Sequence, residues 1–487
     1  MRYLIPAIQL TAAALTCAAQ QNPTYLDTAF GRRPQPMATR HIGSLQPAMQ
    51  ADEQQPTRHA GIYTLANVIN HALTQEESVL TTGWEFFPSR PQRFAPYLDS
   101  IFVPGNTCVQ PCDIVEHDPL STTAQMIKSR LSRLGIQYNL TLSTNYTGIV
   151  PHSRGGRNNF WSTNNSFSGT WFLLKKRNNS QGLFLSIEAD WGHGFNFNER
   201  RSSAQNTIGS LSNPQGSLRG GNGVFIPHLA LGYSAFRGKW VGMIGTIDTS
   251  SYLDQNIYSA DWNGNLMNEA FNLNPCLPLE WANWGYLTAW QPTRNFYAMY
   301  TTTGCNGKVN HNPFPFISSN AWVHLAEAGF ITDDFYGLGE GTYRFQYTLT
   351  RYKGKTGCGA AINIQQQLGR GSRLGFFTRC GVMDTDAATV SSVRAAATAG
   401  LVLQAPFRSE GWGSRSNNDQ IALGFLWERA ADSPYRHRDE YGLELSAVVQ
   451  LTPTFFLQPD VQYIFNPIQQ KDRSGEFIFQ LQGVFRF

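Results

Sequence analysis

The fold of this chain is decided by residues 451–487, which read LTPTFFLQPDVQYIFNPIQQKDRSGEFIFQLQGVFRF. From residue 455 to residue 465 every odd position is apolar, and the even positions are polar except Phe456 and Ile464 at the two ends. The alternation returns between residues 476 and 487. The polar positions of both segments are Gln458, Asp460, Gln462, Glu476, Gln480, Gln482 and Arg486. A period of two places alternate side chains on opposite faces of a β-strand.

Two kinds of sheet carry such a pattern: one that covers a soluble core, and one that faces lipid outside and water inside. Here the apolar face ends in aromatic residues, and the chain itself ends on Phe487 without a polar tail. We interpret this combination as the closing strand of a transmembrane β-barrel.

The composition agrees with a lipid-facing surface. Only 15% of the 487 residues are charged, whereas soluble proteins usually carry about 25%. The mean hydropathy of -0.31 and the lack of an apolar run of about 18 residues argue against a helical membrane protein. The net charge of +4 comes without a basic stripe interleaved with aromatic residues, which argues against a nucleic-acid partner.

Residues 1–19 have the features of a secretory signal peptide. Arg2 precedes an apolar run from Leu4 to Leu15, and small residues follow up to Ala19, where we expect cleavage. A lipoprotein anchor at Cys17 is the competing interpretation, although the preceding Ala-Leu-Thr is a poor lipobox. Export without a spanning helix leaves the periplasm, the outer membrane or the medium, and the alternating strands favour the outer membrane.

The region 20–133 is predicted to be an N-terminal leader with short helices. Residues 20–56 show no periodicity, and apolar residues at helical spacing predict a helix within 57–78. A second helix is predicted from Ser121, as N-cap, to about residue 134, with Gly135 as its stop. This region is either a periplasmic appendage or a partial plug, and the sequence leaves both open.

From residue 134 to residue 487 strand-like runs alternate with turns, which predicts a 16-stranded antiparallel transmembrane β-barrel. The short turns follow even-numbered strands and the longest loops, 193–223 and 249–280, follow odd-numbered ones. A barrel with both ends in the periplasm requires this asymmetry, and only the connection 405–417 is too long for its side. The runs are 134–147, 165–176, 181–192, 224–236, 240–248, 281–290, 295–303, 321–331, 342–352, 358–368, 373–382, 390–404, 418–428, 439–451, 454–465 and 476–487.

The polar faces of these strands would line a lumen, because barrels of about 16 strands can hold an aqueous channel. Both signs of charge occur there, which suits neutral, hydroxyl-rich solutes, whereas a phosphate channel would need a ring of Lys or Arg. For any one charge, an ion pair that braces the barrel wall is the alternative role. The predicted lining residues are Glu188, Asp190, Arg344, Gln346, Arg373, Arg379, Glu444, Gln458, Asp460, Gln462 and Gln480.

Three stretches resemble the carbohydrate-selective porins of Gram-negative outer membranes, the OprB type. They are LTPTFFLQPDVQYIFNP at 451–467, WGYLTAWQPTRNFYAMY at 284–300 and IGTIDTSSYLDQNIYSADWNGNLMNEAF at 244–271. The resemblance covers about residues 121–487 and implies an outer-membrane channel for passive diffusion of sugars. A general or amino-acid-selective porin of the same fold, and a structural or adhesive barrel with a closed lumen, are the alternatives.

The loop 249–280 is the best candidate for a constriction, because a loop of this length in a compact fold is usually functional or disordered. Its amides and carboxylates could bind sugar hydroxyls, and its aromatic rings could pack against sugar C–H faces. An exposed extracellular loop is the alternative. The candidate sugar contacts are Tyr252, Asp254, Asn256, Tyr258, Asp261, Trp262 and Asn263.

Six of the seven cysteines follow the signal peptide and fall into three pairs, for which an oxidising compartment favours disulfides. Cys358 and Cys380 are almost symmetric about a predicted turn, as are Cys276 and Cys305. Cys108 and Cys112 lie in the short stretch CVQPC, where metal binding is the rival interpretation. We therefore predict the bridges Cys108–Cys112, Cys276–Cys305 and Cys358–Cys380.

Catalytic interpretations fail, because the histidines are scattered and neither a Gly-x-Ser-x-Gly elbow nor a P-loop spacing is present. We expect no enzyme, no cofactor and no metal site. The expected partners are outer-membrane lipid and lipopolysaccharide, small neutral sugars and the outer-membrane barrel assembly machinery. The oligomeric state is left open.

Overall fold

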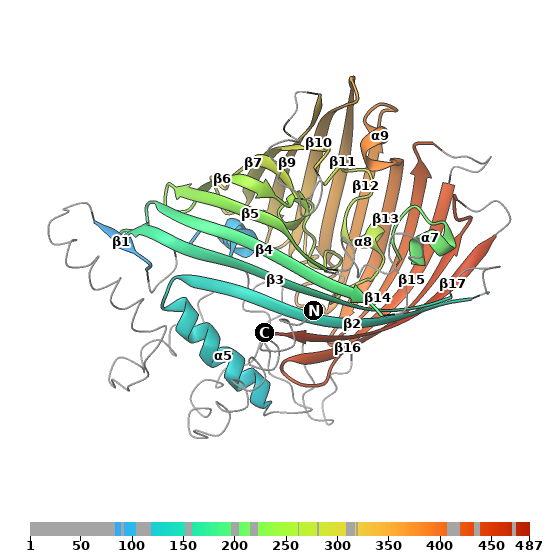
Figure 1. The fold of residues 1–487 in the computed structure, drawn as a ribbon, viewed down its shortest axis with the longest axis horizontal. Helices are drawn as coiled ribbons and strands as arrows, with labels where there is room; N and C mark the ends of the chain where they lie inside the picture. Colours follow the sequence, from blue (N-terminus) through green and yellow to red (C-terminus); the bar gives the residue numbers. More distant parts are fainter. Residues whose placement is uncertain are drawn as a thin grey trace.

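The computed structural model describes residues 83–88, 92–103, 118–150, 158–195, 204–214, 223–261, 263–279, 282–307, 317, 320–406, 419–432, 439–469 and 474–487. In this part of the chain sixteen antiparallel strands, β2 to β17, close into one barrel (Figure 1). Their bounds are β2 Ile136–Val150, β3 Asn159–Lys176, β4 Gly182–Gly194, β5 Gly223–Ala235, β6 Trp240–Ile247, β7 Asn283–Trp290, β8 Phe296–Gly304, β9 Ala321–Thr332, β10 Gly341–Tyr352, β11 Lys355–Gln367, β12 Leu374–Met383, β13 Val393–Gln404, β14 Gln420–Ala430, β15 Asp439–Gln450, β16 Phe455–Phe465 and β17 Gly475–Arg486. The predicted fold class is confirmed.

Each barrel strand pairs with its neighbour in the sequence, and β17 pairs with β2 to close the cylinder. In the closing pair Gln480 lies opposite Thr147 and Phe479 lies opposite Gly148. A short additional strand, β1 (Trp84–Phe86), pairs with the end of β3. The connections sort by length: most of those at one end are short turns, and the longest lie at the other end. In outer-membrane barrels the short turns lie in the periplasm.

The two faces of the wall differ as the alternation predicts. On β17 the apolar residues Phe479 and Leu481 point outward and are 47% and 51% exposed, while Gln480 and Gln482 point inward and are 4% and 1% exposed. Lipid would cover the outward set, so its exposure in the isolated chain is the expected property of a membrane barrel.

The extracellular hairpin between β10 and β11 is tighter than the sequence suggested. Lys353 and Gly354 alone connect the two strands, and both have a positive φ, of 51° and 81°. Two central residues with positive φ form the turn that matches the twist of a two-residue hairpin. The strand β11 therefore begins at Lys355, three residues before the predicted start. The predicted long connection 405–417 lies largely outside the described residues.

The helices are short, and among the described residues none is long and apolar enough to cross a membrane. The predicted second helix is confirmed as α5 (Pro119–Ser132), and Gly135 follows it with φ +74°. Its N-cap is Asp118 and not Ser121: the Asp118 carboxylate accepts from Leu120 N at 2.9 Å and also from Thr452 Oγ1 at 2.9 Å. This second bond ties α5 to the β15–β16 turn. The predicted helix within 57–78 and the signal peptide lie outside the described residues.

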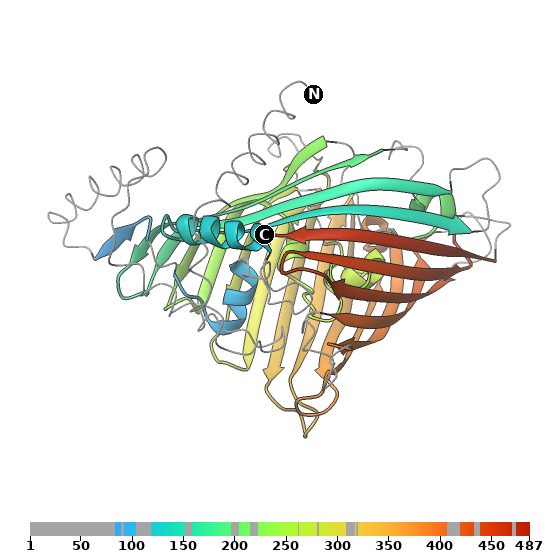
Figure 2. The same ribbon diagram turned by 90° about the horizontal axis from the view of Figure 1, so that it is seen from below.

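Residues 92–103, which include α4 (Pro96–Phe102), lie inside the barrel at the end with the short turns (Figure 2). Ala95 N donates to Gly238 O at 2.9 Å, and Thr170 Oγ1 donates to Phe102 O at 2.9 Å. Leu98 is fully buried. These contacts pack residues 92–103 against the inner face of the wall.

Candidate functional site

The long segment between β6 and β7 folds into the barrel and not over its rim. It begins with a turn of 3-10 helix, η3 (Thr249–Ser251), which Asp248 caps by accepting from Ser250 N at 2.9 Å. It also contains the short helix α8 (Glu269–Asn272). Apolar side chains from both parts of the segment are fully buried, among them Leu253 and Phe271. We call residues 248–279 the inserted segment; Trp262 within it lies outside the described residues.

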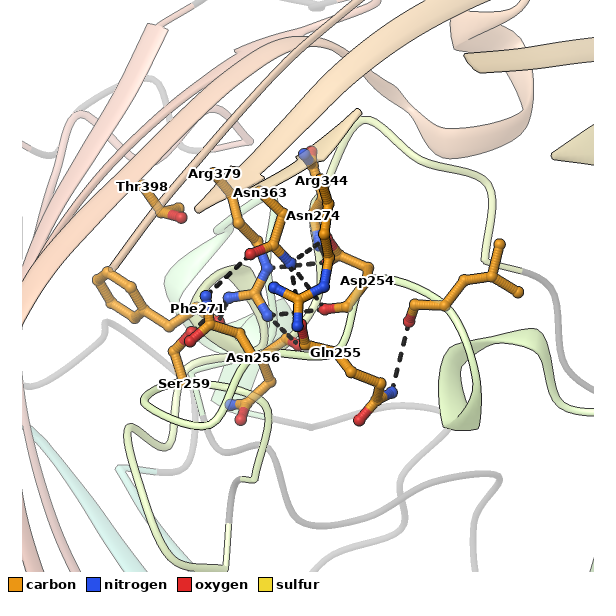
Figure 3. Close-up of polar contacts among 12 residues, drawn as sticks. Asp254, Gln255, Asn256, Ser259, Phe271, Asn274, Arg344, Asn363, Arg379 and Thr398 are labelled. Carbon is orange, nitrogen blue, oxygen red and sulfur yellow. Dashed lines mark hydrogen bonds and ion pairs between the residues drawn. The ribbon is translucent and has the colours of Figure 1, made fainter. Parts of the chain in front are cut away.

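A buried ion pair fixes the inserted segment to the wall (Figure 3). Arg379 Nε on β12 lies 2.8 Å from Asp254 Oδ2, and both side chains are 0% exposed. The same guanidinium donates to the backbone carbonyls of Asp254, at 3.0 Å, and of Phe271. The Asp254 carboxylate also accepts from Asn363 Nδ2 at 2.7 Å and from Asn274 N at 2.7 Å. One arginine thus holds the beginning and the end of the segment together, because residues 254 and 271 both contact it.

Wall carboxylates make further anchors by accepting from backbone N–H groups of inserted chain. On β9, Glu327 accepts from Asp254 N at 2.9 Å. On β15, Glu444 accepts from Asn268 N at 3.1 Å and from Met267 N. Hydrogen bonds to a charged acceptor are about twice as strong as neutral ones. These carboxylates are therefore used in holding the segment and not in contacting a solute.

Wall amides hold the inserted chain through its carbonyl groups. Gln458 Nε2 donates to Asn265 O at 2.7 Å. Gln462 Nε2 and Gln480 Nε2 donate to Pro214 O at 2.9 Å and 2.8 Å, and both also donate to Asp460. Pro214 belongs to a second described stretch of inserted chain, residues 204–214, which contains the helix α7 (Ala204–Ile208). Two separate stretches of chain thus cover the inner face of β14 to β17.

The predicted lining residues mostly lie on the inner face, but inserted chain covers them. Ten of the eleven point inward, and of these only Glu188 is partly exposed. Arg373 is wrong as a lining residue, because it lies exposed in the turn before β12 and donates to Ala405 O at 2.7 Å. The nine buried residues are Asp190, Arg344, Gln346, Arg379, Glu444, Gln458, Asp460, Gln462 and Gln480.

Four of the seven candidate sugar contacts are buried, between 0% and 5% exposed: Tyr252, Asp254, Asn256 and Tyr258. Tyr252 OH, for example, lies 3.1 Å from Ser186 Oγ and 2.9 Å from His228 Nε2. Burial raises the pKa of Tyr258 to about 12. A solute cannot reach these four groups without displacing the segment, so the structure assigns them to its packing.

The other two described candidates, Asp261 and Asn263, are partly exposed and lie at the last residue of the closing strand. Asp261 forms an ion pair with Arg486, and its side chain is 42% exposed. Arg486 Nη2 also donates to Asn263 O at 3.0 Å, and Gln482 donates to Asn263 Oδ1. This exposed edge of the inserted segment is where a solute could meet polar groups.

The two predicted disulfides within the described residues are wrong, because Cys276, Cys305, Cys358 and Cys380 are free thiols. The hairpin between β11 and β12 pairs Gly359 with Met383 and Cys380 with Ile362, so its centre lies two residues beyond the midpoint of Cys358 and Cys380. Cys276 lies inside the barrel and donates to Gly381 O at 3.2 Å, while Cys305 Sγ contacts Arg351 O at 3.8 Å. Burial raises the pKa of the Cys276 thiol. Cys108 and Cys112 lie outside the described residues.

The sequence interpretation missed Glu327 and Asn363, which hold the inserted segment. The inward positions of β9 are Ala321, Val323, Leu325, Glu327 and Gly329. A single carboxylate in an otherwise apolar or small inner face has to find partners when it is buried. The isolated Glu327 was therefore the one feature of β9 from which a contact with inserted chain could have been predicted. Asn363 gave none, because amides are common at inward positions of the neighbouring strands.

Comparison with known proteins agrees with this architecture. Residues 320–487 match the model of the family described as "Carbohydrate-selective porin, OprB family". The high-pH structure of Pseudomonas putida OprB is similar over 79% of this chain and 100% of its own, with a TM-score of 0.58 and 15% identity. A mutant of the Rh. blastica porin is 9% identical over 72% of this chain and 100% of its own, with a TM-score of 0.45. The curated proteins contain no match.

The family match covers β9 to β17, and the similarity to the solved OprB extends the same fold over the rest of the barrel. Residues 320–487 are therefore similar to the carbohydrate-selective porins of the OprB family, and the fold is that of a multi-pass β-barrel of the Gram-negative outer membrane.

Proposed function

We propose that this porin lets small neutral sugars diffuse passively through a lumen narrowed by the inserted segment. The observation that carries the proposal is the Arg379–Asp254 ion pair, which holds that segment inside a barrel of sixteen strands. A barrel of this size is wide enough for water when empty. A segment fixed within it limits the size of the solute and brings polar groups close to it.

The exposed edge of the inserted segment supports a neutral, hydroxyl-rich solute. Asp261 and Arg486 compensate each other's charge, so neither cations nor anions are favoured strongly there. Carboxylate, guanidinium and amide groups can all exchange hydrogen bonds with sugar hydroxyls. We propose Asp261 and Asn263 as sugar contacts of this edge, and Trp262, which stands between them in the sequence, as a further sugar contact.

Swelling of liposomes that contain the purified protein tests the function. We expect monosaccharides and disaccharides to enter faster than amino acids of similar size. Equal rates for all small solutes would identify a general porin, and a preference for amino acids would identify an amino-acid-selective one. A structural or adhesive barrel with a closed lumen would give neither swelling nor ion conductance.

The sugar-contact assignment is tested by the block of ion current when sugar is added. We expect Trp262→Ala to weaken this block, while conductance without sugar stays the same or rises. The matched control is Ile257→Ala on the same segment, because Ile257 is an exposed apolar residue (38%) without aromatic character. Equal weakening by both variants would contradict a stacking role for Trp262.

We also propose outer-membrane lipid, with lipopolysaccharide at the extracellular rim, as the surroundings of the outward apolar face. Exposed outward residues such as Phe425 (45%) and Leu445 (51%) support this. Insertion would require the barrel assembly machinery. Depletion of that machinery should leave the protein protease-sensitive in the periplasm, and normal insertion under depletion would contradict the proposal.

A further inference from the structure

One sector of the inner wall differs from the rest. Away from the strand ends, the inward side chains of β5 to β16 are buried throughout these described strands. On β2, β3 and β4 several inward polar side chains remain partly exposed instead. Away from the strand ends they are Asn139, Thr141, Ser166, Ser168 and Glu188.

These five residues form one continuous surface. Strand register places Asn139 opposite Ser168 and Ser168 opposite Glu188, and it places Thr141 opposite Ser166. On its other side Thr141 lies opposite Arg486 of the closing strand. The surface therefore runs from β4 across β3 and β2 to the Arg486–Asp261 pair. We call these five residues the open sector.

The rest of the periplasmic half is filled by two elements that pack on each other. Tyr97 of α4 stacks on Tyr297 of β8, with ring centroids 3.8 Å apart, and donates to its hydroxyl at 2.8 Å. Phe102 of α4 stacks on Tyr252 of the inserted segment, with centroids 5.2 Å apart. The inserted segment in turn covers the wall beyond through Arg379 and Glu444. Among the described strands, the inward polar side chains that stay partly exposed away from the strand ends are those of the open sector.

From this asymmetry we infer that the solute path through the periplasmic half of the barrel lies off-centre, against the open sector, and that its hydroxyl and amide groups bind the passing sugar. The inference rests on the proposed function for the identity of the solute, but not for the position of the path. Hydroxyl and amide groups both donate and accept, so they can replace water around a sugar. The amides of the covered wall cannot do so, because the inserted chain occupies them.

A chain of weak contacts suits passage better than one tight site. Conduction requires binding that is favourable enough for entry and weak enough for release. The open sector carries three hydroxyl groups, one amide and one carboxylate. Ser251 Oγ already donates to the carboxylate of Glu188 at 3.0 Å, and Lys128 Nζ of α5 donates to the amide oxygen of Asn139 at 3.4 Å, so the three hydroxyl groups are the main groups left for a passing sugar. A sugar could exchange hydrogen bonds along Asn139, Ser168 and Thr141 in succession.

The path is tested with a membrane-impermeant thiosulfonate reagent that adds a sulfonate to a cysteine. Ser168→Cys places the thiol in the open sector, and Ser446→Cys places it on the covered wall, where Ser446 is 1% exposed. We expect the reagent to lower the single-channel conductance of the Ser168→Cys protein at least about twofold and to leave the Ser446→Cys protein unchanged. The wild-type chain treated in the same way gives the background from its native cysteines, and heat-modifiable gel migration verifies folding.

Reaction at Ser446→Cys with no effect at Ser168→Cys would overturn the inference. The sugar-binding part has its own test, in which Asn139→Ala and Ser168→Ala are combined. We expect the sugar concentration for half-block of the current to rise about two- to tenfold, with conductance unchanged. If the sugar concentration for half-block stayed the same in a channel that still prefers sugars, sugar binding by this sector would be refuted. Conductance block at Ser168→Cys in a channel without sugar preference would support the path and contradict only the proposed function.

Discussion

The covered wall and the open sector have inner faces of similar polarity, but they use that polarity differently. On the covered wall Arg379, Glu327 and Glu444 are between 1% and 2% exposed, and their partners are segments of the same chain. In the open sector Ser166 and Ser168 remain partly exposed. A polar side chain that points into a barrel therefore identifies the lumen side of a strand, and does not by itself identify a solute contact.

The choice of residue follows from the surroundings of each wall. A buried charge is costly unless it is paired and hydrogen-bonded, so the covered wall has to supply complete sets of partners. Arg379 has Asp254 and three backbone carbonyl groups of the inserted segment. The hydroxyl groups of the open sector are partly exposed, so solvent can supply their hydrogen bonds and no fixed protein partner is required.

The largest effect is expected when the main anchor of the covered wall is broken. Arg379→Gln leaves the Asp254 carboxylate buried without its cation, which costs about 3–5 kcal/mol for a buried pair. The barrel strands remain paired, so the loss should fall on the docking of the inserted segment. We expect cleavage within residues 248–279 by added protease and a higher conductance.

The control for this variant is Arg294→Gln, which removes an exposed ion pair with Asp333 at 2.9 Å. The two side chains are 67% and 64% exposed, so the loss should stay within about 1 kcal/mol. If Arg379→Gln kept the protease resistance and the conductance of this control, the ion pair would not be the anchor.

A smaller effect is expected when α4 is loosened. Leu98 is fully buried between α4 and the wall, and Leu98→Ala should cost about 2–5 kcal/mol of the docking of residues 92–103. Amide hydrogen exchange of that segment should accelerate, while exchange in β14 to β16 should not change. Ser100→Ala, at an exposed position of the same helix, is the control. If residues 92–103 were equally protected from amide hydrogen exchange in both variants, α4 would not be held by its apolar face.

A further test concerns the fit between the inserted segment and β12. A methyl group at Gly375 would overlap the ring of Tyr258, so Gly375→Ala should cost about 1–3 kcal/mol by forcing that ring away from the wall. We expect weaker protease resistance of the segment than in the wild-type chain. Adding Tyr258→Ala should remove the overlap, so the two substitutions together should cost less than their sum. Strict additivity would contradict the contact.

The barrel itself could be predicted from the sequence because each strand carries its own information. A period of two in a stretch such as residues 455–465 fixes both the element and its two faces. The observed strands start and end within a few residues of the predicted ones, except at β3, which begins at Asn159, six residues early. The shift at β11 has a local cause in the positive φ of Lys353 and Gly354.

The contents of the barrel could not be predicted in the same way, because they depend on contacts between distant residues. Arg379 and Asp254 are 125 residues apart, and neither position shows that the other is its partner. The predicted disulfide between Cys358 and Cys380 failed for a related reason. The centre of the hairpin lies two residues beyond the midpoint of the two cysteines, so Cys380 is four residues away from the position opposite Cys358. The prediction that Arg373 lines the lumen failed because the strand β12 begins one residue after it.

The smallest effect is expected outside both walls, in the periplasmic turns, where Asp334 and Arg370 form an ion pair. Arg370 and the N–H of Gly339 hold the pKa of Asp334 at about 2, below its ordinary value of 3.8. Because the folded-state pKa is lowered, the stabilisation is complete above about pH 4 and is lost as the pH falls through about 2. Asp334→Asn should therefore melt slightly below the wild-type chain at pH 7 and converge with it near pH 2. A melting difference that stays constant between pH 7 and pH 2 would show that the geometry of the turn, and not the charge of Asp334, makes the contribution.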